Sequence, residues 1–321
     1  MRLWEMMIQT MPKVEDDSQV LFLKYLKENA RHVEGAMRSA LPTSRVRPGV
    51  IHEAMRYTAL SDGKRLRPVL VFLACEASGG RRKKAEAVAA ALEFVHAFSL
   101  IHDDLPCMDD DDLRRGKPTN HKVFGEGVAV LAGDALLTLA FELLGLQAKA
   151  LGSEVAAELV LELARGTGSR GVVGGQVLDL ESEGKEVDLR TVQFIHRKKT
   201  ARLFECALRL GGLTGGASSS FLSELGQFGE KIGVAFQIVD DILGEAGNQK
   251  TLGRKPGRDA LLKKATYTRV MGLEASHRTV TRLLREARAL AQDFPSKRRE
   301  FEGFVEVIDA RRRDPGGALL V

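Results

Sequence analysis

Apolar residues recur three and four positions apart along most of this chain, in segments rich in Ala, Leu and Glu. That spacing places them on one face of an α-helix. No segment stands out with the period-2 alternation that is typical of a half-buried strand. The pattern predicts an all-α fold, with helices over residues 84–105, 127–150, 153–166, 189–213, 218–243 and 274–293.

Short runs that contain Gly or Pro separate these predicted helices. No shift in composition marks a domain boundary, and no fixed-period repeat is present. We therefore expect a single domain over residues 1–321, with flexible ends at about 1–15 and 311–321. The separating runs are SGG at 78–80, LPCM at 105–108, GGLTGGASS at 211–219 and RKPGRD at 254–259.

The composition is that of a soluble globular protein, since 44% of the 321 residues are hydrophobic and 28% are charged. The formal net charge of +5 suits nucleic acid, membrane headgroups or anionic substrates, and equally an ordinary basic surface. Cys75, Cys107 and Cys206 lie far apart in the sequence, which disfavours a disulfide framework or a zinc site. They fit a reducing compartment, so we expect a cytoplasmic protein.

The start of the chain does not look like a secretory signal, because it carries acidic residues early and lacks a long apolar core. The most apolar stretch, residues 128–146, is interrupted by Asp134 and Glu142. A helix that crosses a bilayer needs about 20 predominantly apolar residues. We therefore predict a buried core helix at this stretch and no transmembrane segment.

Two adjacent aspartates stand beside an apolar helix face in FQIVDDILGEAG, residues 236–247. Ionised carboxylates at the edge of a core need a cation or several hydrogen-bond donors, unless they lie on a solvated helix face. A helix would align four residues of this stretch in one stripe at i, i+3, i+4 and i+7. They are Gln237, Asp240, Asp241 and Gly244.

A second acidic cluster occurs in HDDLPCMDDDDLRRGK, residues 102–117. Pro106 should end the preceding helix, so that Asp103, Asp104 and residues 109–112 gather at its end. Six carboxylates within ten residues need cations. Their spacing does not match an EF-hand loop, and oxygen ligands suit Mg²⁺, which keeps several waters and bridges to substrate phosphates.

Basic residues accompany both acidic clusters. Each basic run by itself could be a solvated surface. Beside carboxylates that hold Mg²⁺, guanidinium and ammonium groups are what a diphosphate requires, so the combination predicts a diphosphate site. The basic residues are Arg114, Arg115 and Lys117, with further runs at GKRLRP (63–68), HRKKT (196–200) and LGRKPGRD (252–259).

Five stretches together resemble the trans-isoprenyl diphosphate synthases, the enzymes that make geranyl, farnesyl and geranylgeranyl diphosphate. The resemblance extends from about residue 50 to about residue 270 and is specific because five motifs match in order. It implies an all-α bundle around a deep central cavity, the isoprenoid synthase fold, as well as three Mg²⁺ ions and a homodimer. The motifs are GKRLRP, HDDLPCMDDDDLRRGKPTNH, GGQVLDLESEGK, RKKTARLF and FQIVDDIL.

The resemblance also implies a role for each matching residue. The allylic substrate would lose its diphosphate, isopentenyl diphosphate would attack the resulting carbocation, and a proton would be lost, with the released diphosphate as the base. The metal ions would be held by Asp103, Asp104, Asp109 and Asp240, with Asp241 in support. The allylic diphosphate would contact Arg114, Lys199, Thr200, Gln237 and Arg254, and isopentenyl diphosphate would contact Lys64, Arg67, His96 and Arg115.

Phe98 and Ser99 precede the first aspartate motif, where the family sets the depth of its tail pocket. By resemblance to the bacterial farnesyl type, an aromatic residue at this position and the longer DDx4D spacing imply a C15 product, farnesyl diphosphate. Geranyl and geranylgeranyl diphosphate are the alternatives. Phe98 would otherwise be an ordinary core residue.

The sequence departs from the family at its second aspartate motif. Gly244 stands where a third aspartate is usual, Arg254 replaces a lysine, and Glu245 is a neighbouring carboxylate off the stripe. These changes leave open a weakly active regulatory subunit that binds diphosphates. A terpene cyclase is disfavoured because it needs no second diphosphate site of the kind formed by Lys64 and Arg67. A nucleic-acid binder is disfavoured because the acidic clusters would repel phosphates.

Overall fold

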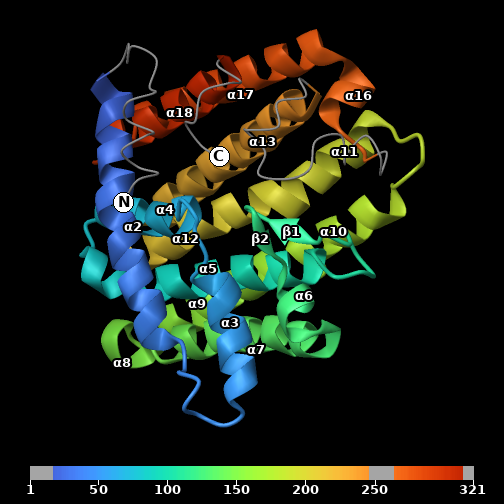
Figure 1. The fold of residues 1–321 in the computed structure, drawn as a ribbon. Helices are drawn as coiled ribbons and strands as arrows, with labels where there is room; N and C mark the ends of the chain where they lie inside the picture. The colour runs from blue at the N-terminus through green and yellow to red at the C-terminus, as the bar shows by residue number, and fades with distance from the viewer. Residues whose placement is uncertain (1–16, 246–263, 314–321) are drawn as a thin grey trace. The chain divides into compact units, whose positions relative to one another are not determined.

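The computed structural model describes residues 17–245 and 264–313, and this part of the chain is almost entirely helical, which confirms the all-α prediction (Figure 1). The only sheet in these residues is an antiparallel hairpin of β1 (Leu113–Arg114) and β2 (Lys117–Pro118). The longer helices are α2 (Asp17–Ala40), α3 (Gly49–Ala59), α4 (Leu66–Ala77), α5 (Arg82–Asp103), α7 (Glu126–Gly145), α9 (Ser153–Thr167), α10 (Val172–Glu181), α12 (Arg202–Gly215), α13 (Ser219–Glu245), α17 (Leu273–Gln292) and α18 (Arg298–Arg313). The shorter ones are α6 (Asn120–Phe124), α8 (Ala148–Leu151), α11 (Leu189–Ile195), the π-helix η1 (His196–Ala201) and α16 (Tyr267–Met271).

Each predicted helix has an observed counterpart, and two of them are interrupted. The helix predicted over 127–150 is divided into α7 and α8. The helix predicted over 189–213 contains η1 between α11 and α12. Single π-helical turns within α-helices are frequent at functional sites. The apolar pattern did not indicate α2, α3, α4, α10 or α18.

One compact unit of the chain contains residues 26–167 and 206–222. Its central helix is α5, which packs against α4 and α7. Large side chains such as Phe72, Leu92 and Phe94 are fully buried there. Burial of one such side chain contributes about 1.5–3 kcal/mol of folding free energy. The C-terminal end of α5 delivers the first aspartate motif, so this core fixes the position of that motif.

The other unit contains residues 17–25, 168–205, 223–245 and 264–313 of the described chain. Its aromatic core includes an edge-to-face pair of Phe228 and Phe301, with ring centroids 5.2 Å apart. Gly233 of α13 lies against η1, because a Cβ atom at this position would stand 2.7 Å from the Cβ of Ala201. The close approach brings the second aspartate motif near the RKKT stretch.

The prediction of a single domain stays a prediction, although α2, α12 and α13 each contribute residues to both compact units. The expected flexible ends lie mostly outside the described residues. One part of that expectation is wrong: Arg311 to Arg313 form the last turn of α18, and Arg311 is only 6% exposed. Arg311 is held in place by contacts described below.

Two of the described helices are long and apolar enough to cross a membrane by length and composition alone, which is weak evidence. In the segment Arg82–Asp103 the most apolar window is 67% buried, as expected of a core helix. In Glu126–Leu151 it is 33% buried. The prediction of a buried helix at residues 128–146 therefore holds for one face of α7, and the other face is exposed.

Candidate active site

The first aspartate motif folds back on the end of α5. The backbone amide of Asp109 donates to the carbonyl of Asp103 over 2.8 Å, and that of Asp111 donates to the carbonyl of Asp104 over 3.2 Å. Asp110 adopts a left-handed conformation with φ of 50°, which aspartate tolerates better than most residues. The turn thus brings Asp109 beside Asp103, as two carboxylates that share a cation require.

Asp104 forms a bidentate ion pair with Arg114 of β1. The Arg114 Nε donates to both carboxylate oxygens at 2.8 and 2.9 Å, and its second nitrogen lies 2.5 Å from Oδ1. Burial acts to lower the pKa of Arg114, but the hydrogen bonds and charge of Asp104 raise it above its usual value. Both residues were expected to face metal or diphosphate. In this structure they bind each other and tie the hairpin to α5.

A group of basic side chains surrounds His96 of α5. Burial, followed by the charges of Arg67, Arg115, Arg114 and Arg65, lowers the pKa of His96 well below its ordinary value. The ring is therefore neutral at pH 7, amid several guanidinium groups. Such a cluster has the charge that an anionic ligand requires. It unites three residues that the resemblance assigns to isopentenyl diphosphate, namely Arg67, His96 and Arg115.

Arg65 supports this cluster and was not singled out from the sequence, although it lies within GKRLRP. It has φ of 53° and precedes α4. Its buried guanidinium donates to Glu93 Oε1 over 2.8 Å and to the carbonyl of Ser61 over 2.6 Å. These bonds fix the loop that carries Lys64. Arg115 is anchored in a similar way, since it donates to the carbonyl of Asp62.

The π-helix η1 presents Lys199 to α10. The Lys199 ammonium lies 2.6 Å from Asp179 Oδ2, and Lys264 approaches the same oxygen at 3.4 Å. Lys264 also lies 3.8 Å from Glu183 Oε1, so two ammonium groups and two carboxylates meet here. Gly175 permits the packing, because a Cβ atom there would lie 2.8 Å from Lys199 Cα and closer still to its backbone nitrogen. The sequence predicted Lys199 as a site residue but did not indicate Asp179 or Lys264.

A chain of hydrogen bonds links Thr200 to the second aspartate motif. The Thr200 hydroxyl donates to Gln237 Oε1 over 2.7 Å, and the Gln237 amide donates to Asp241 Oδ1 over 3.2 Å. The backbone amide of Tyr267 donates to Asp241 Oδ2 over 2.7 Å. Asp241 was expected among the metal ligands. Its carboxylate is buried and bonded to protein donors, which suits a supporting role.

His196 completes the surroundings of Asp241. Its Nε2 lies 3.3 Å from Asp241 Oδ2, and its ring lies over Tyr267 with centroids 5.2 Å apart. Burial above all lowers the pKa of His196 to about 3, with Asp179 acting to raise it and Lys199 to lower it. The ring is therefore neutral, and its contact with Asp241 is not an ion pair at pH 7.

Asp240 contacts a different group from the one that Asp241 contacts. Its Oδ1 lies 2.5 Å from a terminal nitrogen of Arg311, which belongs to α18. The guanidinium of Arg311 also stands over the ring of Phe236, 5.0 Å from the centroid. A cation is thus present on the carboxylate to which the resemblance assigns a metal ion. Arg311 gave no signal in the sequence, because it stands in a basic run near the end.

The remaining predicted residues are less informative. Phe98 is 7% exposed and its ring meets that of His102 edge to face, 4.8 Å away. The Ser99 hydroxyl donates to the carbonyl of His96. Gly244 is half-buried at the end of α13. Arg254 lies outside the described residues.

The donor set fits Mg²⁺ that is shared with a diphosphate. Among residues 17–245 and 264–313, no three Asp, Glu, His or Cys side chains converge into a closed metal cage. Mg²⁺ commonly uses one or two carboxylates, waters and substrate phosphates instead. Asp103 and Asp109 in one unit, and Asp240 in the other, carry carboxylate oxygens of this kind, each set with basic side chains nearby.

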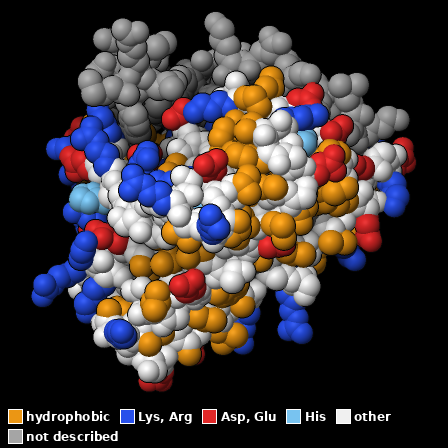
Figure 2. All heavy atoms as spheres, turned by 60° about the horizontal axis from the view of Figure 1, so that its bottom comes forward, with side chains coloured by type: hydrophobic (Ala, Val, Ile, Leu, Met, Phe, Trp, Pro, Cys, Tyr) orange, Lys and Arg blue, Asp and Glu red, His pale blue; other side chains and the backbone are white. Residues whose placement is uncertain are grey.

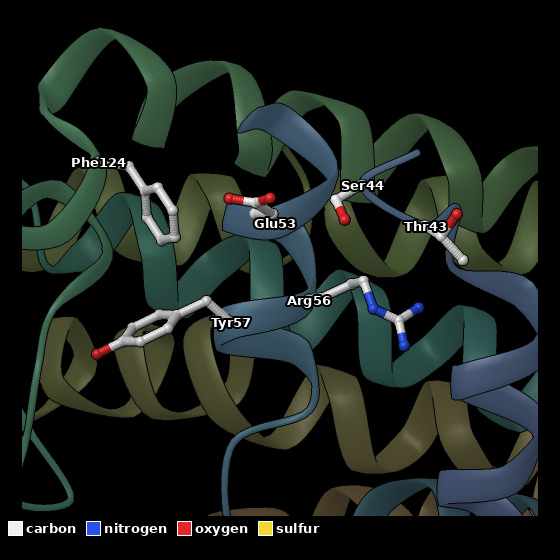
Figure 3. Close-up of a pocket in the computed structure, with 6 residues that line it drawn as sticks. All are labelled: Thr43, Ser44, Glu53, Arg56, Tyr57 and Phe124. Carbon is white, nitrogen blue, oxygen red and sulfur yellow. The ribbon is translucent and has the colours of Figure 1, made fainter. Parts of the chain in front are cut away.

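A pocket of ≈ 540 Å³ lies away from these residues (Figure 3). Glu53, Arg56 and Tyr57 of α3 line it, together with Thr43, Ser44 and Phe124. None of the residues predicted for the site belongs to it. Its location therefore adds nothing to the choice of substrate.

Comparison with known proteins decides the family. The family profile described as Polyprenyl synthetase matches residues 48–301. The chain is a member of the polyprenyl synthetase family. This confirms the resemblance drawn from the five motifs, and it identifies the protein as a prenyltransferase with the isoprenoid synthase fold.

Individual relatives of this polyprenyl synthetase are plant and bacterial proteins. It is 49% identical over 283 residues to "Heterodimeric geranylgeranyl pyrophosphate synthase large subunit 1, chloroplastic" of Arabidopsis thaliana, covering 86% of this chain and 75% of that protein. It is 47% identical over 274 residues to "Geranylgeranyl pyrophosphate synthase, chloroplastic" of Catharanthus roseus, covering 85% and 76%. An FPP/GFPP synthase structure from Zymomonas mobilis matches with a TM-score of 0.80 and 36% identity, over 89% of this chain and 98% of that one.

Proposed function

We propose that this prenyltransferase condenses isopentenyl diphosphate with allylic diphosphates to make geranylgeranyl diphosphate, a C20 product. The observation that carries the chain length is the identity of 49% and 47% to plant proteins named as geranylgeranyl pyrophosphate synthases. The structural relative at 36% identity is named for FPP and GFPP. The C15 product expected from Phe98 is thus less well supported than the C20 alternative.

The site residues form two groups, and each group would bind one of the two diphosphate substrates. Arg67, His96, Arg115 and Lys64 would bind isopentenyl diphosphate, because the neutral His96 ring can donate a hydrogen bond while the surrounding cations attract the anion. Lys199 and Lys264 would face the allylic diphosphate and stabilise the negative charge that develops as its C1–O bond breaks. Thr200 and Gln237 would orient that group through their shared hydrogen bond.

Mg²⁺, when bound, would neutralise the leaving diphosphate. Asp103, Asp109 and Asp240 are the residues that would hold it. Asp104 would act through Arg114, and Asp241 would fix the end of α13 through its bonds to Gln237 and Tyr267. The isopentenyl double bond would then attack the allylic cation, and the released diphosphate would accept the proton that is lost. Apolar walls would keep water from the cation.

One assay tests this proposal. Purified protein is incubated with Mg²⁺, isopentenyl diphosphate and, in turn, dimethylallyl, geranyl or farnesyl diphosphate, and the products are separated by chain length. We expect C20 as the final product. A product that stops at C15 would restore the farnesyl assignment. Absence of condensation with every primer would favour a regulatory subunit, and a hydrocarbon from one substrate would favour a cyclase.

We further propose that the protein is a homodimer through the exposed face of α7. Val130 and Leu131 of α7 and Val123 of α6 are 39%, 56% and 46% exposed. Figure 2, which turns the lower side of Figure 1 forward, shows hydrophobic side chains gathered across this side. Extended apolar surfaces usually mark an interface, and a second copy is the commonest partner. The Arabidopsis relative is named as a heterodimer subunit, so a different partner is the alternative.

Light scattering on the purified protein separates these possibilities. We expect twice the mass of the 321-residue chain. Leu131→Lys should shift the protein towards the monomer, whereas Val20→Lys, at an exposed position on α2, should not. A wild-type monomer at micromolar concentration would refute the homodimer.

We also propose that the protein is cytoplasmic. Both plant relatives are named as chloroplastic, so cell fractionation is needed to distinguish the two locations.

A further inference from the structure

The cation on Asp240 comes from the last described helix. Arg311 lies 2.5 Å from Asp240 Oδ1, where the proposed function would put a divalent metal ion. We propose that Arg311 is a built-in counter-ion that must leave Asp240 before a metal ion is coordinated there, so that free Mg²⁺ is excluded until diphosphate arrives. This inference rests on the proposed function in one respect, the role of Asp240 as a metal ligand.

Arg311 is held for this contact by its own surroundings. Its side chain is 7% exposed, whereas that of Asp240 is 28% exposed, so the guanidinium reaches the carboxylate from the buried side. The ring of Phe236, one turn before Asp240, supports the guanidinium by a cation–π contact at 5.0 Å. Helix α18 is fixed through Phe304, which stacks on Phe22 at 5.0 Å. The contact is therefore part of the packed structure.

Both carboxylates of the second aspartate motif contact protein groups without a metal ion. Asp241 is already bonded to Tyr267 and Gln237, and Gly244 supplies no third carboxylate. A dication that approached Asp240 would meet a guanidinium on the same carboxylate, and like charges at this distance repel strongly. Nearby in this unit, Lys199 pairs with Asp179, and Lys264 approaches both Asp179 and Glu183.

A diphosphate would change these contacts. Its negative charge, placed near Lys199 and Lys264, would leave the motif with net negative charge and would offer Arg311 an alternative partner. The metal ion should therefore bind Asp240 only together with diphosphate, so that the two ligands show strong positive coupling. Arg311 would make the site selective for the metal–diphosphate complex over either component alone.

The test measures Mn²⁺ binding, by electron paramagnetic resonance, with and without inorganic diphosphate and with no turnover. In the absence of diphosphate, Arg311→Gln should gain affinity of about 10-fold at one site, which is the usual size of such coupling. Arg311→Met should do the same while keeping the apolar stem over Phe236, in case the Gln variant does not fold. Arg311→Lys keeps the positive charge and should bind Mn²⁺ as weakly as wild type. Thermal unfolding of each variant shows that the fold is retained.

Two control variants distinguish an error in the metal role of Asp240 from an error in the counter-ion inference. Arg313→Gln removes the same charge two residues on, from a side chain that is 53% exposed, and should leave Mn²⁺ binding unchanged. Asp240→Asn should lose one Mn²⁺ site in the presence of diphosphate. If Asp240→Asn binds like wild type, the metal role of Asp240 is wrong. If Asp240→Asn loses the site while folded Arg311→Gln and Arg311→Met bind like wild type, only the counter-ion inference is overturned.

Discussion

Replacing Gly175 by alanine tests whether α10 and the π-helix position Lys199. The added Cβ atom would stand 2.8 Å from Lys198 C and from Lys199 Cα, and nearer to the Lys199 nitrogen. All three atoms are backbone, so no side-chain rotation can relieve the overlap. Either α10 or η1 must move, and both carry a partner of the Lys199–Asp179 ion pair.

Gly175→Ala should lower both the stability and the turnover of the protein, because α10 or η1 must move. Overpacking of a tight contact typically costs about 1–3 kcal/mol, so Gly175→Ala should lower the free energy of unfolding by that amount. A shift of about 1 Å in a positioning element can reduce turnover about 100-fold. Because Lys199 is proposed to bind the allylic diphosphate, kcat for condensation should fall by a similar factor in protein that remains folded.

Urea denaturation and a steady-state condensation assay measure the two effects. Gly35 is the matched control, because it lies within α2 and a Cβ atom there meets nothing within 4 Å. Gly35→Ala should raise the free energy of unfolding by about 0.5–1 kcal/mol and leave kcat unchanged. If Gly175→Ala matched wild type in both measurements, the close packing of α10 on η1 would be refuted.

Further predictions concern other parts of the site. The pKa of His196 is about 3, so the unfolded chain takes up a proton below about pH 6.5 that the folded ring refuses; the free energy of unfolding should therefore fall by about 2 kcal/mol from pH 6.5 to pH 5. His196→Gln should reduce this pH dependence in urea titrations by about that amount and leave the share of His96, whose pKa is also lowered by burial; an unchanged pH dependence would contradict the assignment. Arg114→Gln removes the bidentate ion pair from buried Asp104 and should cost about 3 kcal/mol or more of stability; a loss below about 1 kcal/mol would show that the pair is not structural. Gly244→Asp should keep or raise the condensation rate at limiting Mg²⁺, and a clear drop would mean that the site is built around the glycine. Phe98→Ala should lengthen the product on chromatography, and an unaltered product spectrum would exclude Phe98 as the floor of the tail pocket.

Much of the fold could be predicted because helix formation here follows the apolar period. α5, α9, α13 and α17 lie where the spacing of three and four residues indicates them. The π-helix could not be predicted in this way, since residues 196–201 contain almost no apolar positions at which a change of helical phase would appear. α10 is short and contains paired glycines, which weaken its helical signal.

The candidate site was predicted in its residue types but not in its pairings. The motifs indicated the acidic and basic side chains, because their density is costly without partners. They did not indicate that Arg114 binds Asp104 or that Arg311 binds Asp240. Such pairs depend on which helices meet, and long-range packing leaves no trace in local spacing. Tyr267 was not predicted for the same reason, because its contacts with Asp241 and His196 are also long-range.

The π-helical turn at His196–Ala201 makes the length of this segment as important as its composition. One residue of an α-helix corresponds to a rotation of about 100°, so the extra residue sets α12 out of phase with α11 by that angle. Deletion of any one residue between 196 and 201 would restore an unbroken α-helix. The residues on one side of the deletion would then turn to another face, so that Lys199–Asp179 and Thr200–Gln237 could not both keep their contacts. The stretch can therefore accept exchanged side chains more readily than a change in residue count.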